Sequence, residues 1–209
     1  MKITKYLHSC LLVEDQKKVV LIDPGNYSYD AKVLDIHVLQ QLDAIVITHE
    51  HMDHMHIPWI QEILQKFPDT TLYTTASAKN ILEQNGITNV HTRGNDFITL
   101  EPVPHEKIWF GPPSENVLAT LFDTLATPGD SHTFTTNATV LALPVTAPWG
   151  STTAAVALAE KLHPRVIIPI HDWHWKDEAR RGFYQRLHEY FSQKGIDFKT
   201  VETGETIAV

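Results

Sequence analysis

Residues 43–54 read Asp-Ala-Ile-Val-Ile-Thr-His-Glu-His-Met-Asp-His. The first six positions are mostly aliphatic, which is typical of a buried β-strand. Four ligand-type side chains follow on the loop after that strand, where α/β sheets gather their ligands: His49, His51, Asp53 and His54. Buried without a cation, these groups would repel one another or stay unpaired. Imidazole and carboxylate donors suit zinc, manganese or iron, so the run predicts a metal site, with a solvated polar loop as the alternative.

Short apolar runs alternate with helical patterns on both sides of this stretch. Twice along the chain, a strand-rich segment is followed by strands that alternate with helices, which favours an α/β fold. We predict a single domain over residues 1–209, a four-layer α/β/β/α sandwich with pseudo-symmetric halves of about 1–96 and 97–209. The predicted strands are 2–7, 9–14, 18–22, 43–48, 72–73, 97–103, 117–122, 140–145 and 166–170, and the predicted helices are 31–42, 58–67, 76–85, 151–162 and a last one around 183–191.

Composition narrows the class of protein. The chain has 209 residues, 43% of them hydrophobic and 20% charged, as in a soluble globular domain. Its net charge of -8 argues against nucleic acid as a partner, because phosphate backbones require clustered Lys and Arg. The single cysteine, Cys10, excludes an intrachain disulfide and a multi-cysteine zinc site. We find no signal-peptide or membrane-span pattern, so we expect a cytoplasmic protein without a membrane partner.

The run His-x-His-x-Asp-His after a strand resembles the signature of the metallo-β-lactamase superfamily, and residues 49–54 match it completely. The resemblance extends over nearly the whole chain, and is strongest to the small branch of L-ascorbate-6-phosphate lactonase-like proteins. That branch opens with a strand ending in Gly-His-Ser-Cys, where this chain has residues 7–10, Leu-His-Ser-Cys. Its Ile-Asp-Pro motif corresponds to residues 22–24. The resemblance implies the four-layer sandwich of the metallo-β-lactamase type.

The resemblance also implies three metal ligands beyond the run. His105, at the end of a predicted strand, is the best match for the first, with His91 as the competitor. Asp130, in the run Pro-Gly-Asp-Ser, matches an aspartate that bridges two metals, although a turn or a helix cap would also suit it. His171 follows the last predicted strand and matches the third ligand, with His174 as the alternative.

Residue by residue, the resemblance then gives two metal sites and a reaction. The first metal would be held by His49, His51 and His105, the second by Asp53, His54 and His171, and Asp130 would bridge. The implied protein is a hydrolase that uses a metal-bridging hydroxide on a small ester, lactone or phosphodiester. Asp53 and Asp130 would also act in catalysis by orienting the nucleophile. Zinc is the default, with manganese or iron as alternatives.

Other residues near the motifs are candidates for contacting substrate. His8 would hold a ligand in place or meet the substrate, unless it is only a packed polar residue, and His132 follows Asp130 by two positions. Trp109 lies just after His105 and is a candidate for substrate contact, as is His174, which lies just after His171. Trp109, Trp149, Trp173 and Trp175 would wall an apolar pocket, with ordinary packing as the alternative.

Two other classes of function compete with hydrolysis of a small-molecule substrate. A non-catalytic metal-binding or sensing protein would retain the same ligands. An oxygen-reducing di-iron protein of this fold would carry His-x-Glu-x-Asp, whereas position 51 is His here. The sequence leaves the substrate, the native metal and the oligomeric state open, because metal ligands set the reaction type and loops choose the substrate.

Overall fold

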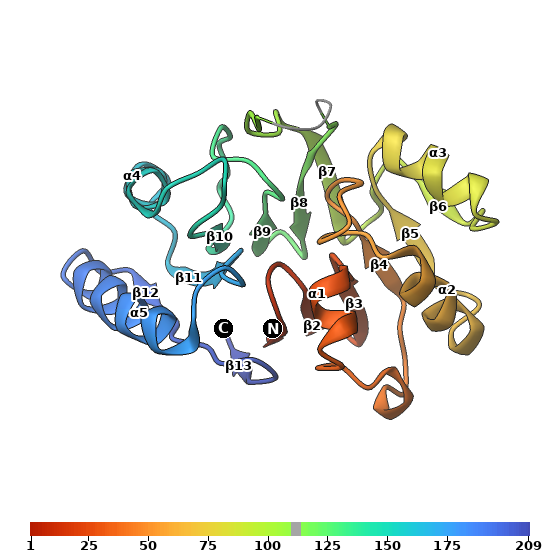
Figure 1. Cartoon of the computed structure of the whole chain (residues 1–209), viewed down its shortest axis with the longest axis horizontal. Coiled ribbons are helices and arrows are strands. Elements are labelled where there is room, and N and C mark those ends of the chain that lie inside the picture. Colours follow the sequence, from red (N-terminus) through yellow and green to blue (C-terminus); the bar gives the residue numbers. More distant parts are fainter. Residues whose placement is uncertain (110–113) are drawn as a thin grey trace.

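The computed structural model describes residues 1–109 and 114–209 and contains two facing β-sheets whose outer faces carry helices (Figure 1). The seven-stranded sheet has the order β13-β1-β2-β3-β4-β5-β6, and the six-stranded sheet has the order β12-β11-β10-β9-β8-β7. The strands of the first sheet are β1 (Lys2–Lys5), β2 (Leu11–Asp15), β3 (Lys18–Ile22), β4 (Ala44–Val46), β5 (Thr71–Tyr73), β6 (Val90–His91) and β13 (Thr206–Ala208). Those of the second are β7 (Ile98–Pro102), β8 (Val117–Leu121), β9 (Leu125–Thr127), β10 (Val140–Pro144), β11 (Val166–Ile170) and β12 (Asp197–Phe198).

In the described residues, five α-helices accompany the two sheets. Figure 1 shows α2 and α3 on the outer side of the first sheet and α4 and α5 on the outer side of the second. Within the described ranges, no helix is long and apolar enough to cross a membrane. The helices are α1 (Asn26–Asp30), α2 (Ile57–Lys66), α3 (Ala76–Gln84), α4 (Thr152–Leu162) and α5 (Asp177–Ser192), and a 3-10 turn spans Ile36–Val38.

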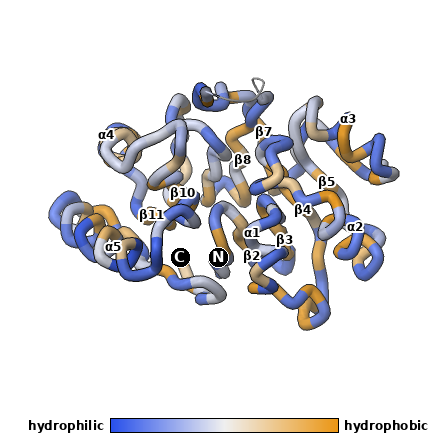
Figure 2. Tube along the Cα trace, viewed as in Figure 1, coloured by the Kyte–Doolittle hydropathy of each residue, from blue (hydrophilic) through white to orange (hydrophobic). Residues whose placement is uncertain are grey.

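Three hydrophobic cores separate the four layers. Side chains alternate along each strand, so Val20 and Ile22 of β3 enter the core between the sheets while Leu21 packs in the core beneath the helices of the first sheet. The third core lies between the second sheet and its helices, with Leu141 and Phe191 among its members. Figure 2 shows hydrophobic residues along the central strands and on parts of the helices. This layering confirms the predicted sandwich.

The predicted helix over 31–42 is wrong. Lys32 has a positive φ of 51°, which ends the short helix α1 and its turn. The Asp35 side chain then accepts a hydrogen bond from the backbone N–H of His37, and this local bond favours a single 3-10 turn over a continuing helix. Leu34 and Ile36 are nevertheless buried, so the apolar spacing reflects packing of an irregular segment.

Chain topology brings many chemically important residues to one edge of the sandwich. Strands β3 to β6 run parallel, and so do β9 to β12. The histidine run follows β4, Asp130 follows β9 and His171 follows β11. The carboxyl ends of these strands therefore meet where the two sheets face each other, which is where the predicted ligands come together.

Candidate metal centre

A first cluster consists of His49, His51, His105 and Asp130, whose ligand atoms all lie within 4.8 Å of one another. His105 Nε2 lies 3.3 Å from His51 Nδ1 and 3.5 Å from Asp130 Oδ2. His49 Nε2 lies 3.8 Å from the same carboxylate oxygen. Three nitrogens and one oxygen thus converge on one point, as the donors of a four-coordinate metal site do.

A second cluster consists of His8, Asp53, His54 and His171, again with ligand atoms within 4.8 Å of one another. His8 Nε2 lies 3.1 Å from Asp53 Oδ2, and the rings of His8 and His171 are 3.8 Å apart. The backbones of His8 and His171 both have positive φ, 63° and 62°, a conformation that costs non-glycine residues roughly 1–3 kcal/mol each. Strain at two facing candidate ligands is consistent with a functional site.

Asp130 lies between the two clusters. Its Oδ1 is 3.1 Å from His54 Nε2 and 3.0 Å from His171 Nε2, so this oxygen faces the second cluster. Its Oδ2 faces His49 and His105 of the first. One carboxylate is therefore placed to serve two cations at once.

Unpaired polar atoms show that the site fits metal ions. Within the described part of the chain, six buried atoms of the clusters lack a hydrogen-bond partner: Nε2 of His49, His54 and His171, Oδ1 of Asp130, and both nitrogens of His8. Buried polar atoms are almost always paired, and binding of an ion is one of the standard reasons for an exception. Nitrogen and oxygen donors of this kind suit zinc, manganese or iron.

Hydrogen bonds on the far side of three imidazoles set their tautomers. Nδ1 of His171 donates to Thr146 O and Nδ1 of His105 to Glu106 O, since a carbonyl oxygen can only accept, and Nδ1 of His54 is hydrogen-bonded to Asp23 Oδ2 at 2.8 Å. Nε2 of each ring then points into its cluster and can offer a lone pair to a cation. Partners of this kind orient metal ligands and raise their basicity.

Asp23 is a residue that the sequence reasoning did not assign to the site. It is fully buried, its Oδ2 lies 2.8 Å from His54 Nδ1, and it accepts from both the N–H and the hydroxyl of Thr48. The sequence signal for Asp23 is the Ile-Asp-Pro motif at residues 22–24, which indicates the resemblance but does not indicate the role of this carboxylate.

The loop that carries Asp130 depends on a close approach that only glycine allows. Gly129 has a φ of +57°, and a Cβ there would lie 2.3 Å from Asn116 Oδ1 and 2.7 Å from Thr48 Cβ. Asn116 is buried and accepts a hydrogen bond from the Asp130 N–H while its amide donates to Pro128 O. Asn116 and Gly129 therefore fix the direction in which Asp130 leaves the backbone.

Burial and mutual charge shape the protonation of the centre. Burial, with His171 next in effect, lowers the pKa of His8 to about 3. Burial together with His54 lowers the pKa of His49 well below its usual value. Burial alone would also lower the pKa of His54, but Asp130, Asp23 and Asp53 outweigh it and raise that pKa well above the usual value. His54 therefore favours its protonated form, whereas His8 and His49 favour their neutral form.

Both carboxylates of the centre stay ionised. Burial would raise the pKa of Asp130, but His171, His54 and His49 hold it well below the usual range. Burial would also raise the pKa of Asp53, but the neighbouring His54 and His8 outweigh this effect and lower that pKa. Two anionic ligands are thus available at neutral pH.

The structure brings all seven predicted metal ligands into the two clusters and adds His8 to the second. His91, the competitor of His105, is exposed at the end of β6, and His174 stays outside the clusters, with its ring 5.8 Å from that of His8. His132 directs Nε2 to Pro144 O, away from the metal ligands. Trp109 is 97% exposed.

Aromatic side chains border the centre. Trp173 stacks on Tyr27 with ring centroids 4.0 Å apart and planes 4° from parallel, and the edge of His8 meets Tyr27 at 5.1 Å. Trp149 lies 5.3 Å from the His171 ring. Trp173 is 47% exposed, so one face of this aromatic border is open to solvent.

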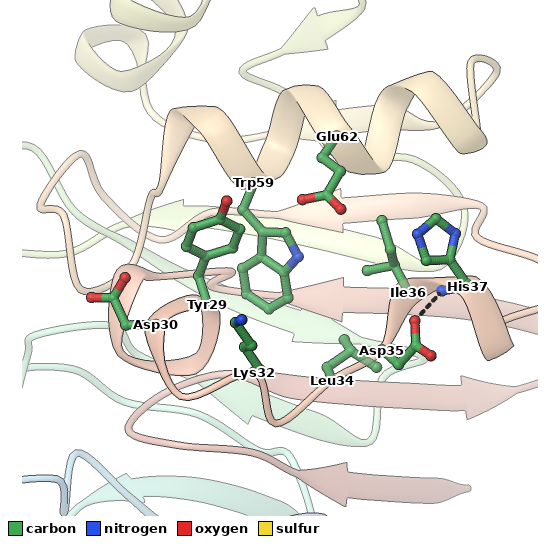
Figure 3. Close-up of a pocket in the computed structure, with 9 residues that line it drawn as sticks. All are labelled: Tyr29, Asp30, Lys32, Leu34, Asp35, Ile36, His37, Trp59 and Glu62. Atoms are coloured by element: carbon green, nitrogen blue, oxygen red, sulfur yellow. Dashed lines mark hydrogen bonds between the residues drawn. The ribbon is translucent and has the colours of Figure 1, made fainter.

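A separate pocket of about 440 Å³ lies between α1 and α2 (Figure 3). Figure 3 shows the ring of Tyr29, from α1, beside the indole of Trp59, from α2, while the Asp30 carboxylate points away from both. None of the eight cluster residues lines this pocket. It is therefore not an extension of the candidate metal centre.

Known proteins resemble this chain over most of its length. The family model for a β-lactamase superfamily domain matches residues 2–171. Protein Rv0786c of Mycobacterium tuberculosis is 30% identical over 205 residues, covering 90% of this chain and 92% of that protein. A hydroxyacylglutathione hydrolase of Blochmanniella pennsylvanica is 35% identical over 88 residues, which is 41% of this chain and 32% of the hydrolase.

Among solved structures, the fold is similar to that of Igni18, a metallo hydrolase from Ignicoccus hospitalis. The TM-score is 0.73 at 22% identity, with 99% of this chain and 97% of that chain covered. The chain therefore belongs to the β-lactamase superfamily, and the superfamily predicted from residues 49–54 is confirmed.

Proposed function

We propose that the chain is a dinuclear metal-dependent hydrolase that cleaves a small ester, lactone or phosphodiester. The observation that carries this proposal is the position of Asp130, with one carboxylate oxygen toward each cluster. A single-metal or purely structural site has no use for a shared carboxylate between two four-residue clusters. Paired metals about 3.5–4 Å apart are typical of metallohydrolases.

The two clusters define which residues would hold the ions. His49, His51 and His105 would bind the first and Asp130 would be shared, as the sequence predicted. The second ion would be held by His8, Asp53, His54 and His171, which is one ligand more than the sequence prediction gave. When bound, such ions polarise a carbonyl or phosphoryl oxygen and lower the pKa of a coordinated water toward about 7. Zinc is the proposed metal, with manganese or iron as alternatives.

Residues of the chain would supply orientation and charge around that chemistry. Asp53 is 21% exposed at its side chain and ionised, so it can accept a hydrogen bond from the attacking water. His8 Nε2 lies 3.1 Å from Asp53 Oδ2, so these two side chains face the same position in the second cluster. The exposed face of Trp173 offers an apolar surface for the organic part of a substrate.

Charge around the site bears on the substrate. Among the described residues, no lysine or arginine forms an ion pair with a cluster side chain. An anionic group on the substrate would thus be balanced by the ions and not by a basic pocket. The local similarity to a hydroxyacylglutathione hydrolase supports ester-type substrates, including thioesters.

Metal content and turnover, measured on the same samples, test this proposal. Wild type and the variants His51→Ala and His91→Ala would be analysed by inductively coupled plasma mass spectrometry and screened with lactone, thioester and phosphodiester substrates. We expect two ions per wild-type chain, loss of one and of turnover in His51→Ala, and no change in His91→Ala, whose ring lies outside the clusters.

Three outcomes distinguish the alternatives. One ion or none in reconstituted wild type would contradict the dinuclear proposal. Two ions with no turnover on any substrate would favour a non-catalytic metal-binding or sensing protein. An equal effect of His91→Ala and His51→Ala would show that the assignment of the first cluster is wrong.

A further inference from the structure

Trp149 lies in a tight turn, residues 147–150, on the loop that follows β10. Ala147 and Gly150 exchange two backbone hydrogen bonds, N–H to O at 3.0 Å and 3.2 Å, which close the turn around Pro148 and Trp149. Proline fixes the backbone φ one residue before the tryptophan. The turn therefore presents the indole from a constrained backbone.

The indole reaches the shared carboxylate of the metal centre. Trp149 Nε1 donates to Asp130 Oδ2 at 2.7 Å. Oδ2 is the oxygen that faces His49 and His105 of the first cluster, whereas Oδ1 faces the second. A hydrogen bond to an ionised acceptor is roughly twice as strong as a neutral one, and an indole offers one donor in one fixed direction.

Neighbouring residues hold the indole in this orientation. The His132 ring meets Trp149 edge to face at 5.0 Å, and its Nε2 is anchored on Pro144 O at 2.9 Å. A Cβ at Gly150 would lie 3.0 Å from the His132 ring, so glycine lets this imidazole pack against the turn. His132 therefore packs against Trp149 and holds the indole in place. This role of His132 differs from the predicted contact with substrate.

We propose that Trp149 is a positioning residue that fixes Asp130 Oδ2 for the ion of the first cluster. The inference deepens the proposed function and rests on it. The indole occupies one lone-pair direction of Oδ2 and leaves the other for the cation. Without the indole, Oδ2 loses the hydrogen bond that orients it, so the first site loses its preset oxygen. The second site keeps His54 and His171, which Asp23 and Thr146 O hold through Nδ1.

The test compares the two metal affinities in Trp149→Phe, which removes the N–H and keeps an aromatic ring. Stepwise dissociation constants come from competition with a chromophoric chelator, and His51→Ala identifies the constant of the first cluster. We expect the first constant to weaken about 10–100-fold, the usual cost of losing a partner of a metal ligand, and the second to stay unchanged. Cobalt(II) bound at the first site should also show shifted visible absorption bands.

Trp109→Phe is the matched control, since Trp109 is 97% exposed, and both constants should match wild type there. Equal weakening of both sites in Trp149→Phe, or wild-type constants with unshifted cobalt bands, would overturn the inference. Thermal unfolding of the metal-free proteins shows whether the variant folds. If it does not, Trp149→Gln, which restores an N–H donor on a smaller side chain, must bind the first ion more tightly than Trp149→Ala. A wild-type chain that fails to bind two ions would instead contradict the proposed function itself.

Discussion

The two clusters share Asp130 but are held very differently. In the second cluster three of four side chains are buried, and His54 is backed by the fully buried carboxylate of Asp23. In the first cluster His51 is only partly buried, and the imidazole of His105, although its side chain is 4% exposed, is backed only by the carbonyl of the next residue. The second cluster is therefore held more firmly by the frame of the protein, although its Asp53 side chain remains 21% exposed.

A buried ion network extends the frame behind the second cluster. Asp172 follows His171 and accepts from Lys5 Nζ at 2.9 Å and from the Tyr184 hydroxyl. Lys5 is 1% exposed. The network links β1, the loop after β11 and α5. These contacts hold the loop next to His171 in place.

The shared carboxylate should give the largest effect, because it serves both sides of the comparison. We expect Asp130→Ala to lose both ions and to have no detectable turnover, whereas His51→Ala loses only one ion. Metal analysis after gel filtration measures this directly. An Asp130→Ala protein that retained one tightly bound ion would show that the carboxylate serves a single cluster.

The frame behind the second cluster predicts a large effect on stability. Asp172→Asn leaves the Lys5 ammonium buried without a counter-charge, which should lower the free energy of unfolding by about 3–5 kcal/mol. Lys18→Met breaks the exposed pair with Asp43 and should cost only about 0–1 kcal/mol. Urea unfolding of the metal-free proteins measures both. Comparable values for the two variants would mean that the buried network does not stabilise the fold.

A smaller effect separates the two metal sites. Asp23→Asn removes the negative charge behind His54, and the second ion should bind about 10–100-fold more weakly. The first ion should be unaffected, which is the opposite of the pattern expected for Trp149→Phe. Asp35→Asn is the control, because Asp35 caps only the 3-10 turn. Weakening of both ions by Asp23→Asn would mean that the clusters are not independently supported.

Most residues of the two clusters could be predicted from the sequence, because their positions along the chain determine where they lie in the fold. Residues 49–54 are close in the chain, and strands that run parallel bring Asp130 and His171 to the same edge. His8 was placed near the site but not among the ligands. Its position depends on a positive φ and on the pairing of its carbonyl with the His171 N–H, neither of which has a sequence signal.

The fold shows the same division. Short, nearly continuous apolar runs predict β3, β8 and β11 nearly to the residue, whereas the predicted helix over 31–42 is wrong. Its apolar residues have helical spacing, but the positive φ at Lys32 and the Asp35 side chain decide its path. The contact between Trp149 and Asp130 was also beyond sequence reasoning, because it joins two loops that are 19 residues apart in the chain.

The two clusters also differ in the protonation of their histidines. Burial would lower the pKa of His54, but its three carboxylate neighbours raise it well above the usual value, so a cation entering the second cluster must displace a proton. In the first cluster, burial lowers the pKa of His49 and His51, so both are already neutral at pH 7.

Lowering the pH from 8 to 6 should therefore weaken binding of the second ion more than that of the first, because protons compete with the cation for His54. Calorimetric titration in buffers of different ionisation enthalpy counts the protons released. We expect more protons to be released when the second ion binds than when the first does. Equal pH dependence at both sites would mean that the charge of Asp23, Asp53 and Asp130 is not concentrated on His54, and that the two clusters do not differ in their electrostatics.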